Sequence, residues 1–257
     1  MAEATVTLVQ TGVQVVSAAL YLWVARTILT RDLAGDTRRA NTLFGVWWLA
    51  LGSVFLLAPL FTLPSRLGGY ENLALSITLL NLLLILIVVA AWGLAYYLTY
   101  LYTGNPRWFW PITAFYVVLG ILLLYAIAWL NPVGFDATGR LAYEHESLPR
   151  APAMGISLLF SLPILTAALA YGSLFFRVNT TEARYRIAMV SGGFILQFGW
   201  SLVSGLLQLS RRFPDAAWLP FISNAFGIIA AIAVLLAFRP PRMLRERWGL
   251  RHHRGGT

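Results

Sequence analysis

The chain has 257 residues, of which 59% are apolar and only 11% are charged, and its formal net charge is +9. A soluble domain carries about 25% charged residues to cover its surface with polar groups, so this composition excludes an ordinary soluble fold. The absence of cysteine excludes disulfides and thiolate metal sites, and the absence of lysine excludes a Schiff base to a bound aldehyde.

Long apolar runs recur along the chain. A run of about 20 apolar residues crosses the ~30 Å hydrocarbon core as a helix, and lipid admits only helices or closed barrels. Because these runs are much longer than a barrel strand, we expect an all-α integral membrane protein, a bundle of seven transmembrane helices. The expected spans are 5–30, 41–62, 73–102, 109–130, 152–176, 186–209 and 217–238.

The segments between the expected spans contain turn-forming or charged residues and are predicted as loops. They are 31–40, 63–72, 103–108, 131–151, 177–185 and 210–216. The first ten residues lack the basic start of a secretory signal peptide, so we expect the first run to be a retained span. The chain then divides into a transmembrane domain over 1–238 and a basic tail over 239–257.

The nineteen arginines are divided unevenly between the two sides of the expected spans. Thirteen fall on the side of the C-terminus, and Arg26 lies near the end of the first span. The five on the other side are Arg66, Arg140, Arg150, Arg211 and Arg212. By the positive-inside rule the side with thirteen arginines is cytoplasmic. We therefore expect a multi-pass protein of the cell (inner or plasma) membrane, with the N-terminus out and the C-terminus in.

Two polar segments of the chain have similar patterns. The segment 31–38 follows the first expected span and 177–184 follows the fifth; each begins and ends with arginine and has an acid two residues before its end. This pattern favours a 3+1+3 parallel repeat, in which spans one to three and five to seven are joined by span four, as in some transporters. The alternative is that cytoplasmic loops commonly collect arginines around an acid, and the sequence leaves both interpretations open.

Neutral polar side chains recur at three- and four-residue spacing in the first and sixth expected spans, which places each set on one helical face. Lipid offers an amide no hydrogen-bond partner, so these faces are expected to turn inward and to line an outward-facing, uncharged pocket. The candidate ligand-binding residues are Gln10, Gln14, Ser17, Tyr21, Ser76, Asn81, Gln197, Trp200, Ser201, Ser204 and Asn224.

Helix packing explains the same residues in another way. Glutamine, asparagine and serine commonly hydrogen-bond one membrane helix to another, at about 0.6 kcal/mol on average, and small residues permit close approach. Ser201 and Gly205 form one small-xxx-small pair of this kind. Pure packing therefore stays open as the alternative to a pocket.

The tail interleaves apolar residues with arginines. A short amphipathic helix there would place its apolar side chains in the inner leaflet and its arginines, each worth about 1 kcal/mol, against anionic head groups. The residues expected at the membrane surface are Arg242, Arg245, Arg247, Trp248 and Arg251. We expect anionic inner-leaflet lipids as the partner and no nucleic acid, because no nucleic-acid-binding fold or aromatic platform accompanies the charge.

No acid or histidine falls in the middle of an expected span; the histidines are His145, His252 and His253, in a loop and in the tail. Membrane-embedded zinc or haem needs histidine at depth, and catalysis needs an activated nucleophile, a metal or an acid there. We therefore expect no cofactor, no metal and no enzymatic activity.

Three functions are compatible with this sequence. The first is a receptor-like sensor of a small neutral ligand, which would act through a separate effector protein because no signalling domain is attached. The second is a facilitative transporter of a neutral solute, which the parallel repeat would suit. The third is a structural subunit of a larger membrane complex. The outward-facing polar pocket favours the first.

Overall fold

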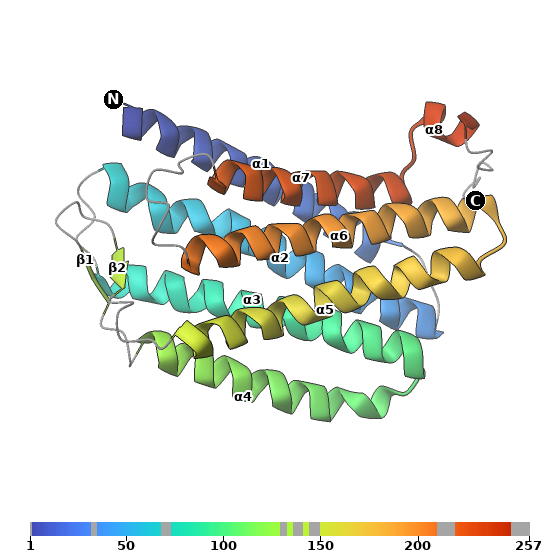
Figure 1. Cartoon of the computed structure of the whole chain (residues 1–257), viewed down its shortest axis with the longest axis horizontal. Coiled ribbons are helices and arrows are strands. Elements are labelled where there is room, and N and C mark those ends of the chain that lie inside the picture. The colour runs from blue at the N-terminus through green and yellow to red at the C-terminus, as the bar shows by residue number, and fades with distance from the viewer. Residues whose placement is uncertain are drawn as a thin grey trace.

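The computed structural model describes residues 2–31, 35–67, 73–128, 133–135, 141–143, 150–209 and 219–247. Its elements are α1 (Ala2–Leu29), α2 (Gly35–Leu67), α3 (Leu73–Thr103), the 3₁₀ helix η1 (Pro106–Trp108), α4 (Phe109–Ala128), β1 (Val133–Phe135), β2 (Leu141–Tyr143), α5 (Arg150–Arg177), α6 (Thr181–Leu209), α7 (Leu219–Phe238) and α8 (Arg242–Arg247). The long helices lie side by side, with the N-terminus and the strands at one end and α8 at the other (Figure 1). We call the end with α8 the arginine-rich end.

Four helical segments are long and apolar enough to cross a bilayer: Leu8–Leu29, Thr37–Leu60, Ile77–Thr103 and Pro106–Tyr125. Shorter apolar helices cover Ser161–Arg177 and Asn224–Phe238 of the described residues. Large apolar side chains are exposed around the bundle, among them Phe176 and Ile121, as a surface in contact with lipid requires. The chain thus has the make-up of a helical membrane bundle, while the count of seven spans and the orientation stay predictions.

Several predicted boundaries differ from the structure. We expected loops at 31–40 and 63–72, but α2 begins at Gly35 and continues to Leu67. Similarly, α6 begins at Thr181, inside the predicted loop 177–185, and the predicted loop 131–151 contains the antiparallel pair β1 and β2. Polar residues at the end of a spanning helix reach water without breaking the helix, so a fall in hydropathy marks the edge of the membrane and not the end of the helix.

A tight turn places α4 against α3. Gly104 ends α3 in the left-handed region (φ +61°), and its backbone N–H donates to the carbonyl of Tyr100 at 2.8 Å. The Asn105 side chain then accepts from the backbone N–H of Arg107 at 2.9 Å, and Pro106 occupies the first position of η1. The chain therefore reverses within a few residues, and α4 packs back along α3.

Six of the helices form a closed ring of neighbours. Going round it, α1 packs against α2, α2 against α3, α3 against α5, α5 against α6, α6 against α7, and α7 against α1. The seventh long helix, α4, packs against α3 from outside this ring and lies along the edge of the bundle in Figure 1.

Aromatic side chains pack the interior of the ring. The buried ring of Phe44 on α2 lies 5.2 Å from Tyr97 of α3, 5.9 Å from Phe194 of α6 and 6.3 Å from Phe238 of α7, measured between centroids. Tyr97 also hydrogen-bonds through its hydroxyl to the hydroxyl of Tyr171 on α5. One aromatic cluster therefore connects helices from both halves of the chain, which sets the spacing of the elements that hold the polar residues.

Candidate functional site

The best-defined polar site centres on Tyr21, whose side chain on α1 is completely buried. Its hydroxyl donates to Oε1 of Gln197 on α6 at 2.6 Å, and it lies 3.2 Å from the backbone carbonyl oxygen of Gly227 on α7. A phenol has a single proton to donate, so the two oxygens are alternative acceptors and the nearer one, on Gln197, is favoured. The site joins three helices through one hydroxyl group.

Glycine at position 227 permits this approach. A Cβ added there would lie 3.1 Å from the Tyr21 hydroxyl, closer than most side chains tolerate. The absence of a side chain therefore exposes the Gly227 carbonyl to the tyrosine, although a helical carbonyl is normally occupied within its own helix.

Aromatic rings pack against the Tyr21 ring and against one another. Trp48 and Phe55 of α2 each lie 5.1 Å from the Tyr21 ring, and Trp200 of α6 lies 5.8 Å from Phe55. We call Tyr21, Trp48, Phe55, Gln197, Trp200 and Gly227 the Tyr21 cluster. Its side chains are neutral, and its aromatic rings exclude water from the hydrogen bond.

The Tyr21 cluster holds two polar groups without a partner. Nε2 of Gln197 and Nε1 of Trp48 are both buried and make no hydrogen bond, and on α1 the same is true of Oε1 of Gln14, two turns from Tyr21. Nearer the arginine-rich end, Thr27 and Trp47 also carry such an atom. A buried donor or acceptor left unpaired costs about 1–3 kcal/mol of stability. A polar molecule that hydrogen-bonds to one of these atoms would recover part of that free energy.

The remaining predicted pocket residues have different environments. Ser17 is buried, but its hydroxyl donates to the carbonyl of Val13 in its own helix at 2.8 Å. Asn224 is buried on α7 one turn before Gly227. Half-buried positions are held by Gln10, Gln14 and Ser201.

Three further predicted positions add little to the cluster. Asn81 is half-buried on α3, a helix that contributes no member of the Tyr21 cluster. Ser76 lies on α3 and Ser204 on α6, but their side chains fall outside the described residues. The structure thus brings together Tyr21, Gln197 and Trp200 from the predicted set.

Three members of the Tyr21 cluster were not predicted: Trp48, Phe55 and Gly227. No polar side chain lies three or four residues from Trp48 or Phe55 along the chain, so neither residue belongs to a polar helical face. Gly227 contributes through its backbone. The only signal in the sequence is that Gly227 interrupts an otherwise apolar run one turn after Asn224.

Two grooves lie away from the cluster, one of about 410 Å³ between α2, α3 and α4 and one of about 370 Å³ between α5 and α6.

The structure describes part of the predicted membrane-surface tail. Arg242 is exposed on α8 and donates to Oε1 of Glu246 at 2.8 Å, while Met243 beside it is 82% exposed. Arg245 is half-buried, and the side chain of Arg247 as well as Trp248 and Arg251 fall outside the described residues. The helix α8 is six residues long, shorter than the predicted amphipathic segment.

Comparisons with known proteins assign no family to this chain. No protein-family model matches it, and no curated protein matches it. Within the described residues, no three histidine, aspartate or glutamate side chains are grouped so that they could hold a metal ion. Function must therefore be argued from the Tyr21 cluster and the arrangement of the helices.

Proposed function

We propose that this protein is a receptor-like membrane sensor that binds a small neutral molecule at the Tyr21 cluster. The observation that carries the proposal is the environment of the Gln197 side chain, which is fully buried. Its carbonyl oxygen accepts a hydrogen bond from Tyr21, while its NH₂ group has no partner. Helix packing alone explains why the Gln197 oxygen is hydrogen-bonded. It does not explain why the structure tolerates the free-energy cost of burying the unpaired amide nitrogen.

The unpaired atoms suggest the chemistry of the ligand. Gln197 Nε2 and Trp48 Nε1 are donors, and Gln14 Oε1 is an acceptor. The Tyr21 cluster contains no charged side chain, so a charged ligand would lose its hydration without a counter-ion. We therefore expect a neutral molecule with at least one carbonyl or hydroxyl oxygen, held between aromatic rings.

The two acceptors of Tyr21 provide a route to signalling. A ligand that draws the Gln197 side chain towards itself frees the Tyr21 proton, which then turns to the Gly227 carbonyl, 3.2 Å away in the structure. Binding would thereby weaken the link between α1 and α6 and strengthen the link between α1 and α7. A ligand shifts such an equilibrium only as far as it binds one arrangement better than the other.

Such a sensor needs a binding site open to one side of the membrane and an effector site on the other. Seven helices cross the membrane, the N-terminus lies outside, and the arginine-rich end lies in the cytoplasm, where an effector protein would bind. The excess of arginine at that end supports this orientation.

A facilitative transporter is a second candidate, and the ring of helices favours it. In the ring, α1 packs on α2 and α2 on α3, just as α5 packs on α6 and α6 on α7, while α4 lies outside. In addition, Trp48 follows Arg38 at the same spacing as Phe194 follows Arg184, and both rings are buried. A 3+1+3 repeat of this kind is an arrangement that some carriers use.

Thermal unfolding of the purified protein against a panel of neutral metabolites tests ligand binding. A ligand at 100 times its Kd stabilises the native state by about 2.7 kcal/mol. We expect Gln197→Leu to abolish that shift and Thr99→Val to preserve it, because the Thr99 hydroxyl on α3 bonds only the carbonyl of Ala95 in its own helix. A panel without any shift would favour a structural subunit.

Flux into liposomes then separates the two candidate functions. A receptor binds the ligand of the first experiment without passing it, whereas a facilitator equilibrates the labelled ligand across the membrane. A single cysteine at position 14 or 197 reports access, because the natural chain has no other thiol. If neither cysteine reacts with a water-soluble reagent in the folded, ligand-free protein, the cluster has no path to water and the proposal fails.

A further inference from the structure

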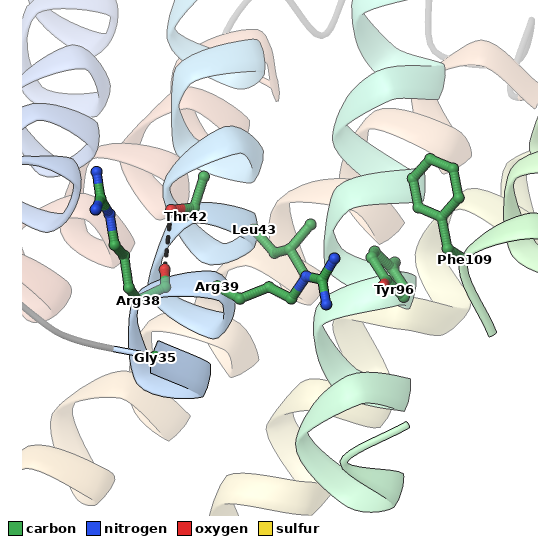
Figure 2. A pocket seen from close by; sticks show the side chains of 7 residues that line it. All are labelled: Gly35, Arg38, Arg39, Thr42, Leu43, Tyr96 and Phe109. Atoms are coloured by element: carbon green, nitrogen blue, oxygen red, sulfur yellow. Dashed lines mark hydrogen bonds between the residues drawn. The ribbon is translucent and has the colours of Figure 1, made fainter. Parts of the chain in front are cut away.

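A groove of about 410 Å³ lies at the arginine-rich end of the bundle, apart from the Tyr21 cluster. It is lined by the first turns of α2, the last part of α3 and the start of α4: Gly35, Arg38, Arg39, Thr42, Leu43, Tyr96 and Phe109. Figure 2 shows the Arg39 guanidinium extending from α2 towards Tyr96 on α3, with Phe109 beyond it. The groove therefore combines a cationic entrance with an apolar wall.

Arg39 is held over the groove and is exposed. Its guanidinium carbon lies 5.8 Å from the centre of the Tyr100 ring, a cation–π distance, whereas the Arg38 side chain extends from α2 to the other side (Figure 2). The backbone N–H groups in the first turn of a helix have no acceptor within that helix, so the start of α2 also favours an anion. A phosphate-bearing group is the chemistry that guanidinium side chains bind best.

Exposed aromatic residues place the groove at the membrane surface. Phe109, which lines the groove, lies between Trp108 and Trp110, and these are 47% and 73% exposed. Tyr102, at the end of α3, is 62% exposed. Tryptophan and tyrosine gather at the level of the lipid head groups, so the entrance of the groove lies at that level.

We infer that this groove binds one anionic phospholipid, with the phosphate on Arg39 and the start of an acyl chain against Leu43 and Phe109. The inferred occupant is a lipid and not a free anion because Leu43 and Phe109 give the groove an apolar wall, and the exposed rings of Trp108 and Trp110 flank Phe109. A soluble phosphate would use the arginine and leave that wall empty.

The test counts lipids retained by the purified full chain in neutral detergent, by native mass spectrometry. The probes are phosphatidylglycerol and phosphatidylcholine with identical acyl chains. We expect one phosphatidylglycerol to be retained about tenfold more than phosphatidylcholine, and Arg39→Gln to remove most of that preference, as the loss of one bidentate phosphate contact would. Equal retention of the two lipids by the natural protein would overturn the inference.

Two further variants separate the groove from general surface charge. Arg177→Gln removes the same charge at the same end, from an exposed side chain at the end of α5, and should leave the preference within about twofold. Thr42→Trp fills the groove without changing charge, and the natural hydroxyl bonds only the Arg38 carbonyl of its own helix, so the variant should lose phosphatidylglycerol. A loss in Arg177→Gln equal to that in Arg39→Gln would contradict a specific site.

Inorganic phosphate and glycerol phosphate provide the last arm. If either displaces phosphatidylglycerol at millimolar concentration, the groove binds a free anion and the lipid assignment is wrong. If neither competes, the acyl chain contributes to binding as inferred.

Discussion

The hydroxyl oxygen of Tyr21 lies 2.6 Å from Oε1 of Gln197, so a single hydrogen bond joins the first and sixth long helices where neither side chain is exposed. In a medium without water such a bond has no solvent competitor, and the partner left behind by a mutation stays unpaired. The pair therefore links α1 to α6 across the ring and decides the state of the proposed binding site.

A double-mutant cycle measures this pair. Tyr21→Phe leaves Gln197 buried with neither end paired, so we expect it to lower the free energy of unfolding by about 1–3 kcal/mol. Gln197→Leu should cost less, because Tyr21 retains the Gly227 carbonyl as an acceptor. The double variant should be more stable than Tyr21→Phe alone, since it removes both polar partners. Strictly additive effects in detergent unfolding would mean that the hydrogen bond contributes nothing.

Two adjacent glycines of α6 form a matched test of helix packing. A Cβ at Gly193 would lie 2.8 Å from Cγ2 of Val234 and 3.2 Å from the carbonyl oxygen of Ala230, whereas a Cβ at Gly192 would meet nothing within 4 Å. We expect Gly193→Ala to destabilise the fold by about 1–3 kcal/mol, because α7 must move, and Gly192→Ala to be neutral or stabilising. Equal thermal midpoints for the two variants would show that α6 and α7 do not pack this closely.

The hydroxyl pair of Tyr97 and Tyr171 tests the closure of the helix ring between α3 and α5. Either single change to phenylalanine removes that bond and leaves the other hydroxyl buried, at an expected cost of about 1 kcal/mol. The double change should restore part of the loss, because both rings keep their aromatic contacts. Tyr116→Phe on the peripheral α4 is the control. Its effect on the free energy of unfolding should be the same alone and in combination with Tyr97→Phe or Tyr171→Phe.

Arg31 tests the charge at the arginine-rich end. It donates to the carbonyl oxygen of Phe238 at 3.3 Å and lies 4.6 Å over the Phe238 ring, so it caps the end of α7. Burial, followed by the charges of Arg186 and Arg239, lowers the pKa of Arg31. A cation whose pKa is lower in the folded state than in the unfolded state costs stability wherever it stays charged, which includes neutral pH.

Removing one of those charges should therefore help. We expect Arg239→Gln to raise the free energy of unfolding by about 0.5 kcal/mol at low salt, a gain that shrinks in about 0.5 M salt as the repulsion is screened. Arg107→Gln, in the turn after α3, is the control and should change little at either salt concentration. A gain that does not depend on salt would exclude charge repulsion as its cause.

The sequence by itself determined where the helices run. Apolar runs of membrane length predict seven long helices, and α1 to α7 lie at those places. The bounds agree closely at 73–102 against Leu73–Thr103, whereas α2 extends beyond the predicted 41–62 at both ends. The three- and four-residue spacing of Gln14, Ser17 and Tyr21 also placed these side chains on one face. Both features are local, because hydropathy and helical periodicity depend only on neighbours along the chain.

Only the tertiary structure decided which faces meet. Nothing along the chain indicates that Tyr21 reaches Gln197 and the Gly227 carbonyl, that Tyr97 meets Tyr171, or that α4 lies outside the ring. Lateral neighbours in a bundle are selected by the fit of side chains across helices far apart in sequence, and in lipid no difference in hydrophobicity distinguishes one apolar face from another. A backbone carbonyl freed by a glycine carries no sequence pattern of its own, which is why the acceptor at Gly227 could not be predicted.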